Sequence, residues 1–374
     1  MKGNTEYLAS EATALLKEMI AIPSTSFEED GVCTHLCQRL QEMGIAPERI
    51  GNNIVCEMIT CPSSPTLMLC AHIDTVVAAS GYSFDPFVPD YAIAAEVIGE
   101  NIGRKVTEDE IVAGLGSNDD GASVVVLISV FRYFLNHPEE AGIPNLTLVL
   151  TSEEERSGPD GMRSLWGKRL SRIQYAIIGE PTGMKAATSE RGLLVIDAVS
   201  EGVSGHAARN EGVNAIYKAV EDIDRLRSHK FTKSSPLMGE VHLNVTQINA
   251  GTAHNVVPDK CTFVVDIRPT EQYTNEEIFN ELQEICSSTL KARNLANRSS
   301  ATREGSPLAA AAEACGIETF SSPTTSDWMR IGCDAIKMGP GESSRSHKKD
   351  EFVLVDEIKN AIDTYIEFIG SIKL

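Results

Sequence analysis

Short apolar runs alternate with helical patterns along the first half of the chain. Apolar residues recur at helical spacing over residues 5–20 and 28–44, and residues 120–136 are apolar enough for a buried helix. Fully apolar runs that suit buried strands occupy residues 66–71, 146–151 and 175–179. Because such strands are covered on both faces, this alternation predicts an α/β sheet between layers of helices.

The pattern changes after Gly183, where the predicted strands gain a polar face. We expect strands at 192–201, 241–248 and 260–268 and helices at 214–228 and 274–290. This order suits a small α+β module inserted into the larger domain. We therefore expect a larger domain built from residues 1–183 and 295–374, and an inserted domain over residues 184–294.

The remaining segments lead back into the larger domain. The polar residues 292–306 are expected to carry the returning chain, and another helix begins at 307–316. Residues 351–371 are strand-like at first and then helical. The sequence has neither an internal repeat nor a low-complexity tract.

Composition and charge narrow the class of protein. The 374 residues are 42% hydrophobic and 23% charged, a globular balance, and no apolar run reaches the roughly 18 residues of a membrane span. A formal net charge of −20 disfavours contact with nucleic-acid phosphates. Nine cysteines without CxxC pairing, and an N-terminus without an apolar signal core, predict reduced thiols and a cytoplasmic location. We expect a small-molecule enzyme without nucleic-acid or membrane partners.

Side chains that commonly bind metals follow the apolar strands. The side chains at the strand ends are His72, Asp74, Glu153, Glu154, Glu155 and Glu180. Asp119 lies in a Gly-rich turn before the buried helix, and His347 lies in a Gly-rich loop near the C-terminus. Ligands of open α/β sheets bind at the edge where the strands end, so these residues are candidates for one site.

Each of these motifs also has a structural explanation. His72 suits a hydrogen-bonded strand end, Asp119 a helix cap, and the three acids a solvated turn. Together, two histidines and three carboxylates with a spare glutamate suit zinc or a similar ion. A carboxylate two residues after a histidine can fix the ring of that histidine, and a bridging carboxylate suits a pair of ions.

The motifs then resemble a known family, the co-catalytic metallohydrolases that include acetylornithine deacetylase, succinyl-diaminopimelate desuccinylase, glutamate carboxypeptidase and aminoacylase. The resemblance rests on His72-Ile-Asp74-Thr-Val, Gly114-Leu-Gly116-Ser-Asn-Asp119, Glu154-Glu155, Gly179-Glu180-Pro-Thr, Ser204-Gly205-His206, and Gly339-Pro-Gly341 followed by His347 and Asp350-Glu351. It implies a mixed-sheet, zinc-peptidase-like domain with an inserted dimerisation domain, or lid. A homodimer formed through the lid is expected.

The resemblance also implies a set of metal ligands. His72 and Glu180 would hold one ion, Glu155 and His347 would hold the other, and Asp119 would bridge both. In this family the peptide bond after the bridging acid is cis. Two divalent ions are expected per subunit, zinc first and cobalt as the alternative.

Further roles follow from the same resemblance. Asp74 would orient its neighbouring histidine, and Glu154 would act as general acid and base. Because Glu153 is also an acid, the register within the acidic run stays open. His206 would reach the site of a partner subunit and polarise the scissile carbonyl. The residues expected to contact substrate are Asn255, Arg268, Arg191 and Gly341.

The expected reaction is hydrolysis of the amide bond of an N-acyl-L-amino acid. N-acetyl-L-ornithine or N-succinyl-L-ornithine, in arginine biosynthesis, is the favoured substrate, because residues 176–182 and 212–216 resemble acetylornithine deacetylase. A succinyl group would need an extra cation, for which Arg191 and Arg345 are candidates. The alternatives are succinyl-diaminopimelate desuccinylase, an aminoacylase or dipeptidase, and an inactive scaffold. A dehydrogenase is disfavoured because no Gly-x-Gly-x-x-Gly turn follows the first strand.

Overall fold

The computed structural model describes residues 2–138, 144–209 and 211–373. The chain divides into two compact units. The large unit comprises Met1–Thr188, Thr302–Phe320 and Ser326–Leu374, and the small unit comprises Ser189–Ala301 and Ser321–Thr325. Among the helices of the described part, none combines the length and apolar character that a bilayer crossing requires.

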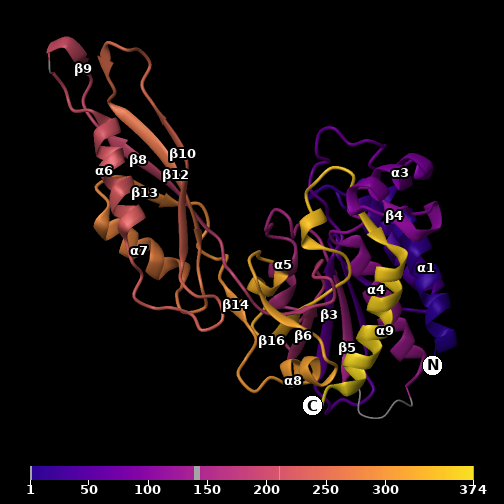
Figure 1. The fold of residues 1–374 in the computed structure, drawn as a ribbon. Helices are drawn as coiled ribbons and strands as arrows, with labels where there is room; N and C mark the ends of the chain where they lie inside the picture. Colours follow the sequence, from indigo (N-terminus) through magenta and orange to yellow (C-terminus); the bar gives the residue numbers. More distant parts are fainter. Residues whose placement is uncertain (1, 139–143, 210, 374) are drawn as a thin grey trace. The chain divides into compact units, whose positions relative to one another are not determined.

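A mixed β-sheet forms the centre of the large unit (Figure 1). Its main strands are β1 (Glu48–Ile50), β2 (Asn53–Met58), β3 (Thr66–His72), β5 (Asn145–Thr151), β6 (Tyr175–Ile178), β7 (Ala186–Glu190) and β16 (Asp334–Lys337). They lie in the order β1-β2-β5-β3-β6-β16-β7. Strands β5, β3, β6 and β16 run parallel, whereas β1, β2 and β7 run antiparallel to their neighbours. The predicted mixed α/β sheet is therefore confirmed.

Alternation along β3 shows how the sheet is buried on both faces. Leu67 and Leu69 join the main core, whereas Met68 and Cys70 join the core on the opposite face. The helices of the main core are α1 (Lys2–Ile20), α2 (Asp30–Glu42), α4 (Gly121–Asn136), α8 (Pro307–Ala314) and α9 (Val355–Ser371). The short helix α5 (Met162–Trp166) packs on the other face.

A short strand pair outside the main sheet connects two distant parts of the large unit. Strand β4 (Ile111–Ala113) pairs antiparallel with β17 (Phe352–Leu354), with Phe352 opposite Ala113. Helix α3 (Tyr91–Ile102) packs beside this pair in a small core of its own. The pairing brings the residues after β4 next to the residues before β17.

The small unit is a four-stranded antiparallel sheet with helices against it. Its elements are β8 (Leu194–Glu201), α6 (Ala215–Ser228), β10 (His242–Ala250), β12 (Lys260–Arg268), α7 (Asn275–Ile285) and β13 (Thr289–Ala292). The strand order is β10-β12-β8-β13, and α6 and α7 share one core with the buried face of the sheet. Two short strands, β9 (Gly205–His206) and β11 (Val256–Val257), pair with each other, and β14 (Ser300–Ala301) pairs with the end of β7.

One predicted element of this unit is too long. The helix expected over 274–290 ends at Ile285, because Cys286 has an extended backbone and residues 289–292 pair with β8 as strand β13. The start of the helix follows the sequence, since Thr274 and Glu277 form a reciprocal capping box.

Candidate active site

The predicted site residues of the large unit converge at one edge of its sheet. His72 ends β3, the acidic run follows β5, and Glu180 follows β6. These three strands are parallel neighbours, so their carboxyl ends meet at the same edge. Asp119 reaches this edge from the turn before α4.

His72 and Asp119 form the centre of the cluster. The Nε2 atom of His72 lies 3.2 Å from Oδ1 of Asp119, and both side chains are buried. The peptide bond between Asp119 and Asp120 is cis, as the resemblance implied. Burial is the largest single effect on Asp119 and would raise its pKa, but the hydrogen bond and charge of His72, together with Ser346 and His347, lower that pKa.

Asp74 contacts both the histidine and the acidic run. The Nδ1 atom of His72 lies 3.0 Å from the carbonyl oxygen of Asp74 and 3.5 Å from its carboxylate. The carboxylate also accepts main-chain N–H groups from Glu154 at 3.0 Å and Glu155 at 3.1 Å, and the hydroxyl of Ser26 at 2.6 Å. Asp74 therefore fixes the backbone that presents the acids as well as the ring of His72.

The three acids of the run point to different places. Glu153 has a left-handed backbone with φ of 60°, and its carboxylate accepts the main-chain N–H of Asp160 at 2.9 Å. Glu154 and Glu155, in contrast, place carboxylate oxygens among the ligand atoms around His72. This geometry supports the register in which Glu154 and Glu155 serve the site.

Two groups of ligand-type atoms share His72. One consists of His72, Asp119 and Glu155, and the other consists of His72, Glu154 and Glu180. Within each group the ligand atoms lie within 4.8 Å of one another. His347 joins the first group, because its Nε2 atom lies 3.0 Å from Glu155 and 3.7 Å from Asp119.

At this edge of the sheet, burial and the closeness of other carboxylates disfavour the ionised forms of the acidic side chains. Burial raises the pKa of Glu154 well above its ordinary value, and the carboxylates of Glu180 and Asp327 raise it further. Burial and the charge of Asp119 raise the pKa of Glu180 in the same direction. A cation bound among these groups would offset both effects. The donor set of imidazole nitrogens and carboxylate oxygens fits first-row divalent ions such as zinc.

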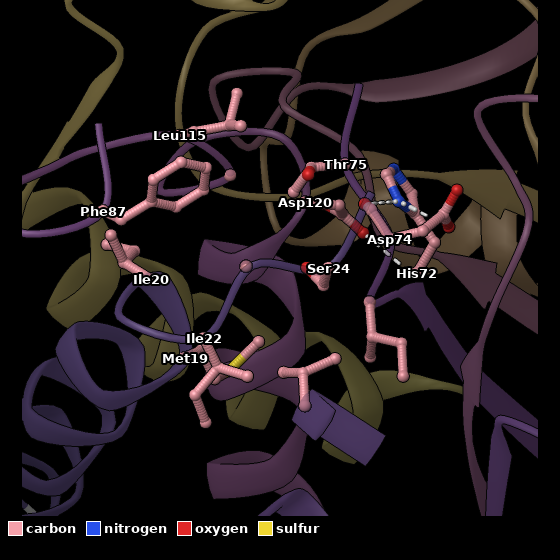
Figure 2. A pocket seen from close by; sticks show the side chains of 14 residues that line it. Met19, Ile20, Ile22, Ser24, His72, Asp74, Thr75, Phe87, Leu115 and Asp120 are labelled. Carbon is pink, nitrogen blue, oxygen red and sulfur yellow. Dashed lines mark hydrogen bonds and ion pairs between the residues drawn. The ribbon is translucent and has the colours of Figure 1, made fainter. Parts of the chain in front are cut away.

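A small cavity lies beside this cluster. Figure 2 shows His72, Asp74, Thr75 and Asp120 around one side of it, and it continues toward an apolar wall that includes Phe87. Its volume of about 20 Å³ holds roughly one water molecule. It is therefore too small to receive an N-acyl amino acid.

Two of the predicted substrate contacts, Arg191 and Gly341, have structural contacts in their own units. The guanidinium group of Arg191 is buried and donates to the main-chain carbonyls of Met238, Glu240 and Arg268. Gly341 has φ of +78°, and a Cβ there would lie 2.3 Å from Oδ1 of Asn118. The guanidinium group of Arg191 thus binds main-chain carbonyls of the small unit, and Gly341 leaves the space that the side chain of Asn118 occupies.

Arg345 is also committed, so neither candidate for the acyl-pocket cation is free. Its guanidinium group pairs with both carboxylate oxygens of Glu357, at 2.7 and 2.9 Å, and lies over the ring of Phe352. Both guanidinium groups that the sequence offers for a succinyl carboxylate therefore have protein partners in this structure, and their contact with an acyl group stays a prediction.

The remaining predicted residues belong to the small unit. His206 and Asn255 lie together at its short strand pair, where the N–H of Ala207 donates to the carbonyl of Asn255 at 3.1 Å. Both side chains are exposed. Arg268, at the end of β12, pairs with Asp266 of the same strand at 2.9 Å.

Sequence reasoning missed three buried side chains of this site. Asp327 accepts the hydroxyl of Thr151 at 2.6 Å, and burial raises its pKa to about 6. Asn118 and Glu351 contact the loops that carry Asp119 and His347. Asn118 and Glu351 lie inside the motifs that carry the resemblance, and this position was the signal that could have identified them. Their contacts involve main-chain groups, which a sequence does not reveal.

Comparisons with known proteins agree with this architecture. Residues 188–294 match the family model M20_dimer, described as a peptidase dimerisation domain. A succinyl-diaminopimelate desuccinylase from Xanthomonas campestris pv. campestris is 27% identical over 380 residues, covering 94% of this chain and 96% of the relative.

Solved structures share the fold over nearly the whole chain. The aminopeptidase PepT from Bacillus cereus has a TM-score of 0.74 and 19% identity, covering 98% of both chains. The YXEP protein of Bacillus subtilis, described as a dinuclear metal-binding peptidase of the M20 family, has a TM-score of 0.72 and 15% identity, covering 98% of this chain and 99% of its own. The protein is a hydrolytic enzyme with the M20 peptidase fold.

The name of the Xanthomonas campestris relative matches the alternative that the sequence left open, a succinyl-diaminopimelate desuccinylase, and not the favoured N-acyl-ornithine deacylase. Nothing in these matches supports a place in arginine biosynthesis. The dimerisation-domain match covers 188–294, within a few residues of the inserted domain expected over 184–294.

Proposed function

We propose that this M20-type hydrolase cleaves the amide bond of an N-acyl-L-amino acid with the help of two divalent ions, zinc first. The observation that carries the proposal is the pair of ligand groups that share His72, with Glu154 placed inside one of them. The site lies at the carboxyl edge of a parallel strand group, where such folds bind ligands.

The proposed ligands are divided between the two ions. His72 and Glu180 would hold one ion, Glu155 and His347 would hold the other, and Asp119 would serve both. The 3.0 Å contact of His347 with Glu155 and the 3.2 Å contact of His72 with Asp119 support this division. The chemistry that two such ions supply is activation of a water and polarisation of the acyl carbonyl.

Glu154 is the proposed proton carrier. Its carboxylate lies among the ligand atoms around His72, beside the place where the proposed ions would hold a water. As general base it would take a proton from the attacking water, and as general acid it would return the proton to the leaving amine. His206 of a second copy is the proposed additional donor to the carbonyl oxygen.

The acyl group that we favour is succinyl, and the first substrate to test is N-succinyl-diaminopimelate. The name of the curated relative supports this choice. Arg191 and Arg345 have protein partners, and Arg268 likewise pairs with the carboxylate of Asp266. Arg268 is the proposed cation for the second carboxylate, since its guanidinium group is more exposed than that of Arg345.

N-acyl-ornithine remains the second candidate, on the resemblance of residues 176–182 and 212–216 to acetylornithine deacetylase. We therefore propose to compare kcat/KM of the zinc-loaded protein for N-succinyl-diaminopimelate, N-succinyl-ornithine, N-acetyl-ornithine and a tripeptide. A preference for both succinyl compounds over the acetyl compound supports a carboxylate-binding acyl pocket. Turnover of the tripeptide alone would overturn the N-acyl assignment while leaving the hydrolase intact.

A further inference from the structure

A single buried carboxylate holds the loop that carries Asp119. Oε1 of Glu351 accepts the N–H groups of Asn118 and Asp119, both at 2.9 Å, and Oε2 accepts the N–H of Gly116 at 3.1 Å. Glu351 is 3% exposed, so water does not compete for these bonds. The two oxygens of one side chain therefore fix three main-chain N–H groups of the same turn.

Strand pairing delivers Glu351 to this position. Glu351 immediately precedes β17, and β17 pairs with β4 up to Phe352 opposite Ala113. The ladder continues one step further, because the N–H of Gly114 donates to the carbonyl oxygen of Glu351 at 2.9 Å. The side chain of Glu351 thus lies beside the turn that follows β4.

Asn118 extends the contact to the loop that carries His347. Its Oδ1 accepts the N–H of Glu342 at 2.9 Å, and its Nδ2 donates to the carbonyl of Glu342 at 3.2 Å and to the hydroxyl of Ser346 at 3.4 Å. Asn118 is fully buried, and Gly341 leaves the space that its amide occupies. The two loops are thereby fastened to each other by one side chain.

We propose that Glu351 and Asn118 are positioning residues that form a main-chain clamp between the loops of Asp119 and His347. The clamp sets the separation of these two ligands before any ion binds. This inference rests on the proposed function, because it assigns Asp119 and His347 to the metal site. Groups that orient ligands in this way commonly change metal affinity by roughly 10- to 100-fold when they are substituted.

The first test is the variant Glu351→Gln, with zinc affinity measured by competition against a chromophoric chelator. Glutamine keeps the size of the side chain, but it turns one acceptor oxygen into a donor that faces a main-chain N–H. We expect zinc affinity to fall by roughly 10- to 100-fold at one or both sites. The melting temperature of the metal-free protein is measured in parallel.

The neighbouring residue provides a matched control. Asp350 is also a buried carboxylate, but it accepts the N–H of Ser83 at 2.6 Å and the hydroxyl of Ser83 at 3.0 Å, and it does not contact the Asp119 loop. Asp350→Asn should therefore keep the zinc affinity of the parent. A merely structural role for Glu351 would lower the melting temperature of its metal-free variant and leave the zinc affinity of the folded protein unchanged.

A second variant keeps the proposal testable if Glu351→Gln does not fold. Asn118→Ala cuts the link to Glu342 while leaving the Glu351 carboxylate in place, and we expect weaker binding of the ion assigned to Glu155 and His347. Parent-like zinc affinity in either folded variant would overturn the clamp. Failure of the proposed metal site is a separate result, because Asp119→Asn would then bind zinc like the parent.

Discussion

Glu153 and Glu154 are adjacent and chemically identical, but their side chains make different contacts. Glu153 turns away with a left-handed backbone and accepts the N–H of Asp160, whereas Glu154 lies among the ligand atoms around His72. The backbone of the run is fixed by the carboxylate of Asp74, which accepts the N–H groups of Glu154 and Glu155. The identity of the base is therefore a question that single-residue substitution answers.

We predict that Glu154→Gln retains its metal and loses kcat by roughly 10²- to 10⁴-fold. Glutamine preserves shape but cannot exchange the proton that the amide cleavage requires. Steady-state kinetics together with metal analysis of the purified variant checks this. Glu153→Gln is the matched control and should keep kcat near that of the parent, because its carboxylate contacts the main chain. The reverse pattern, with an inactive Glu153→Gln, would shift the register by one residue.

The limits of sequence reasoning are clearest at this scale. His72, Asp119, Glu154, Glu155 and Glu180 were selected from the sequence, and the structure places them in one cluster. Arg191 was selected because a cation suits a succinyl group, but a sequence does not reveal that its guanidinium group is covered by main-chain carbonyls. Glu351 was overlooked for the same reason, since its partners are main-chain N–H groups.

Among secondary-structure elements, the long periodic ones followed the sequence closely. The patterns over 5–20, 120–136 and 66–71 became α1, α4 and β3 with ends displaced by at most a few residues. The strand-like start of 351–371 became β17, whereas the three-residue strand β4 carries no readable period, and its pairing with β17 depends on a distant segment. The overlong helix at 274–290 failed because the pairing of β13 with β8 overrides local helical spacing.

Helix α6 contains a buried carboxylate that ties it to the segment after α7. Asp222 accepts the N–H groups of Ser287 at 3.0 Å and Ser288 at 2.7 Å, and it pairs with Arg225 at 2.6 Å. Burial alone would raise the pKa of Asp222, but the hydrogen bonds from Ser288 and Ser287 outweigh burial and lower it. The ionised form is therefore the one that the folded small unit stabilises.

We predict that Asp222→Asn lowers the free energy of unfolding of the small unit by about 1–3 kcal/mol at pH 7, because buried N–H groups lose their acceptor. Since the folded pKa lies below the unfolded value of about 3.9, this stabilisation is present above that pH and is lost as the pH falls through the folded pKa. Thermal unfolding between pH 3 and 7 should show the difference in stability between the parent and Asp222→Asn shrinking toward pH 3. The exposed Asp224→Asn, on the same helix, should change stability by less than about 1 kcal/mol. A stability difference that grew toward low pH would contradict the stabilising role of the ionised Asp222 carboxylate.

At the scale of the whole molecule, the two units should respond differently to metal. All five proposed ligands lie in the large unit, where burial, and after it the neighbouring carboxylates, raise the pKa of Glu154 and Glu180. We predict that a chelator lowers the melting temperature of the large unit by on the order of 5 to 10 °C, relative to ions at a hundredfold excess over Kd. Differential scanning calorimetry should show the transition of the small unit unmoved. Equal shifts of both transitions would argue against a site confined to the large unit.

The small unit should also govern assembly. It contains the segment that matches a peptidase dimerisation domain, and its edge strand β10 is mostly exposed. An open strand edge pairs readily with another chain. We predict that light scattering coupled to gel filtration gives twice the 40.5 kDa of one chain. A charged substitution at the exposed Ile248 should shift the protein toward the monomer, and an unchanged dimer would place the interface elsewhere.

The points where the chain leaves and re-enters the large unit are already joined by a hydrogen bond. The N–H of Thr302 donates to the carbonyl of Thr188 at 2.9 Å, and just beyond them β14 pairs with the last residues of β7. The inserted segment is thus a loop whose two ends are neighbours, so changing its length beyond the β7–β14 pair leaves the strands of the main sheet in place. Evolution or protein engineering can therefore replace the insert at this junction while the residues proposed to bind metal keep their positions.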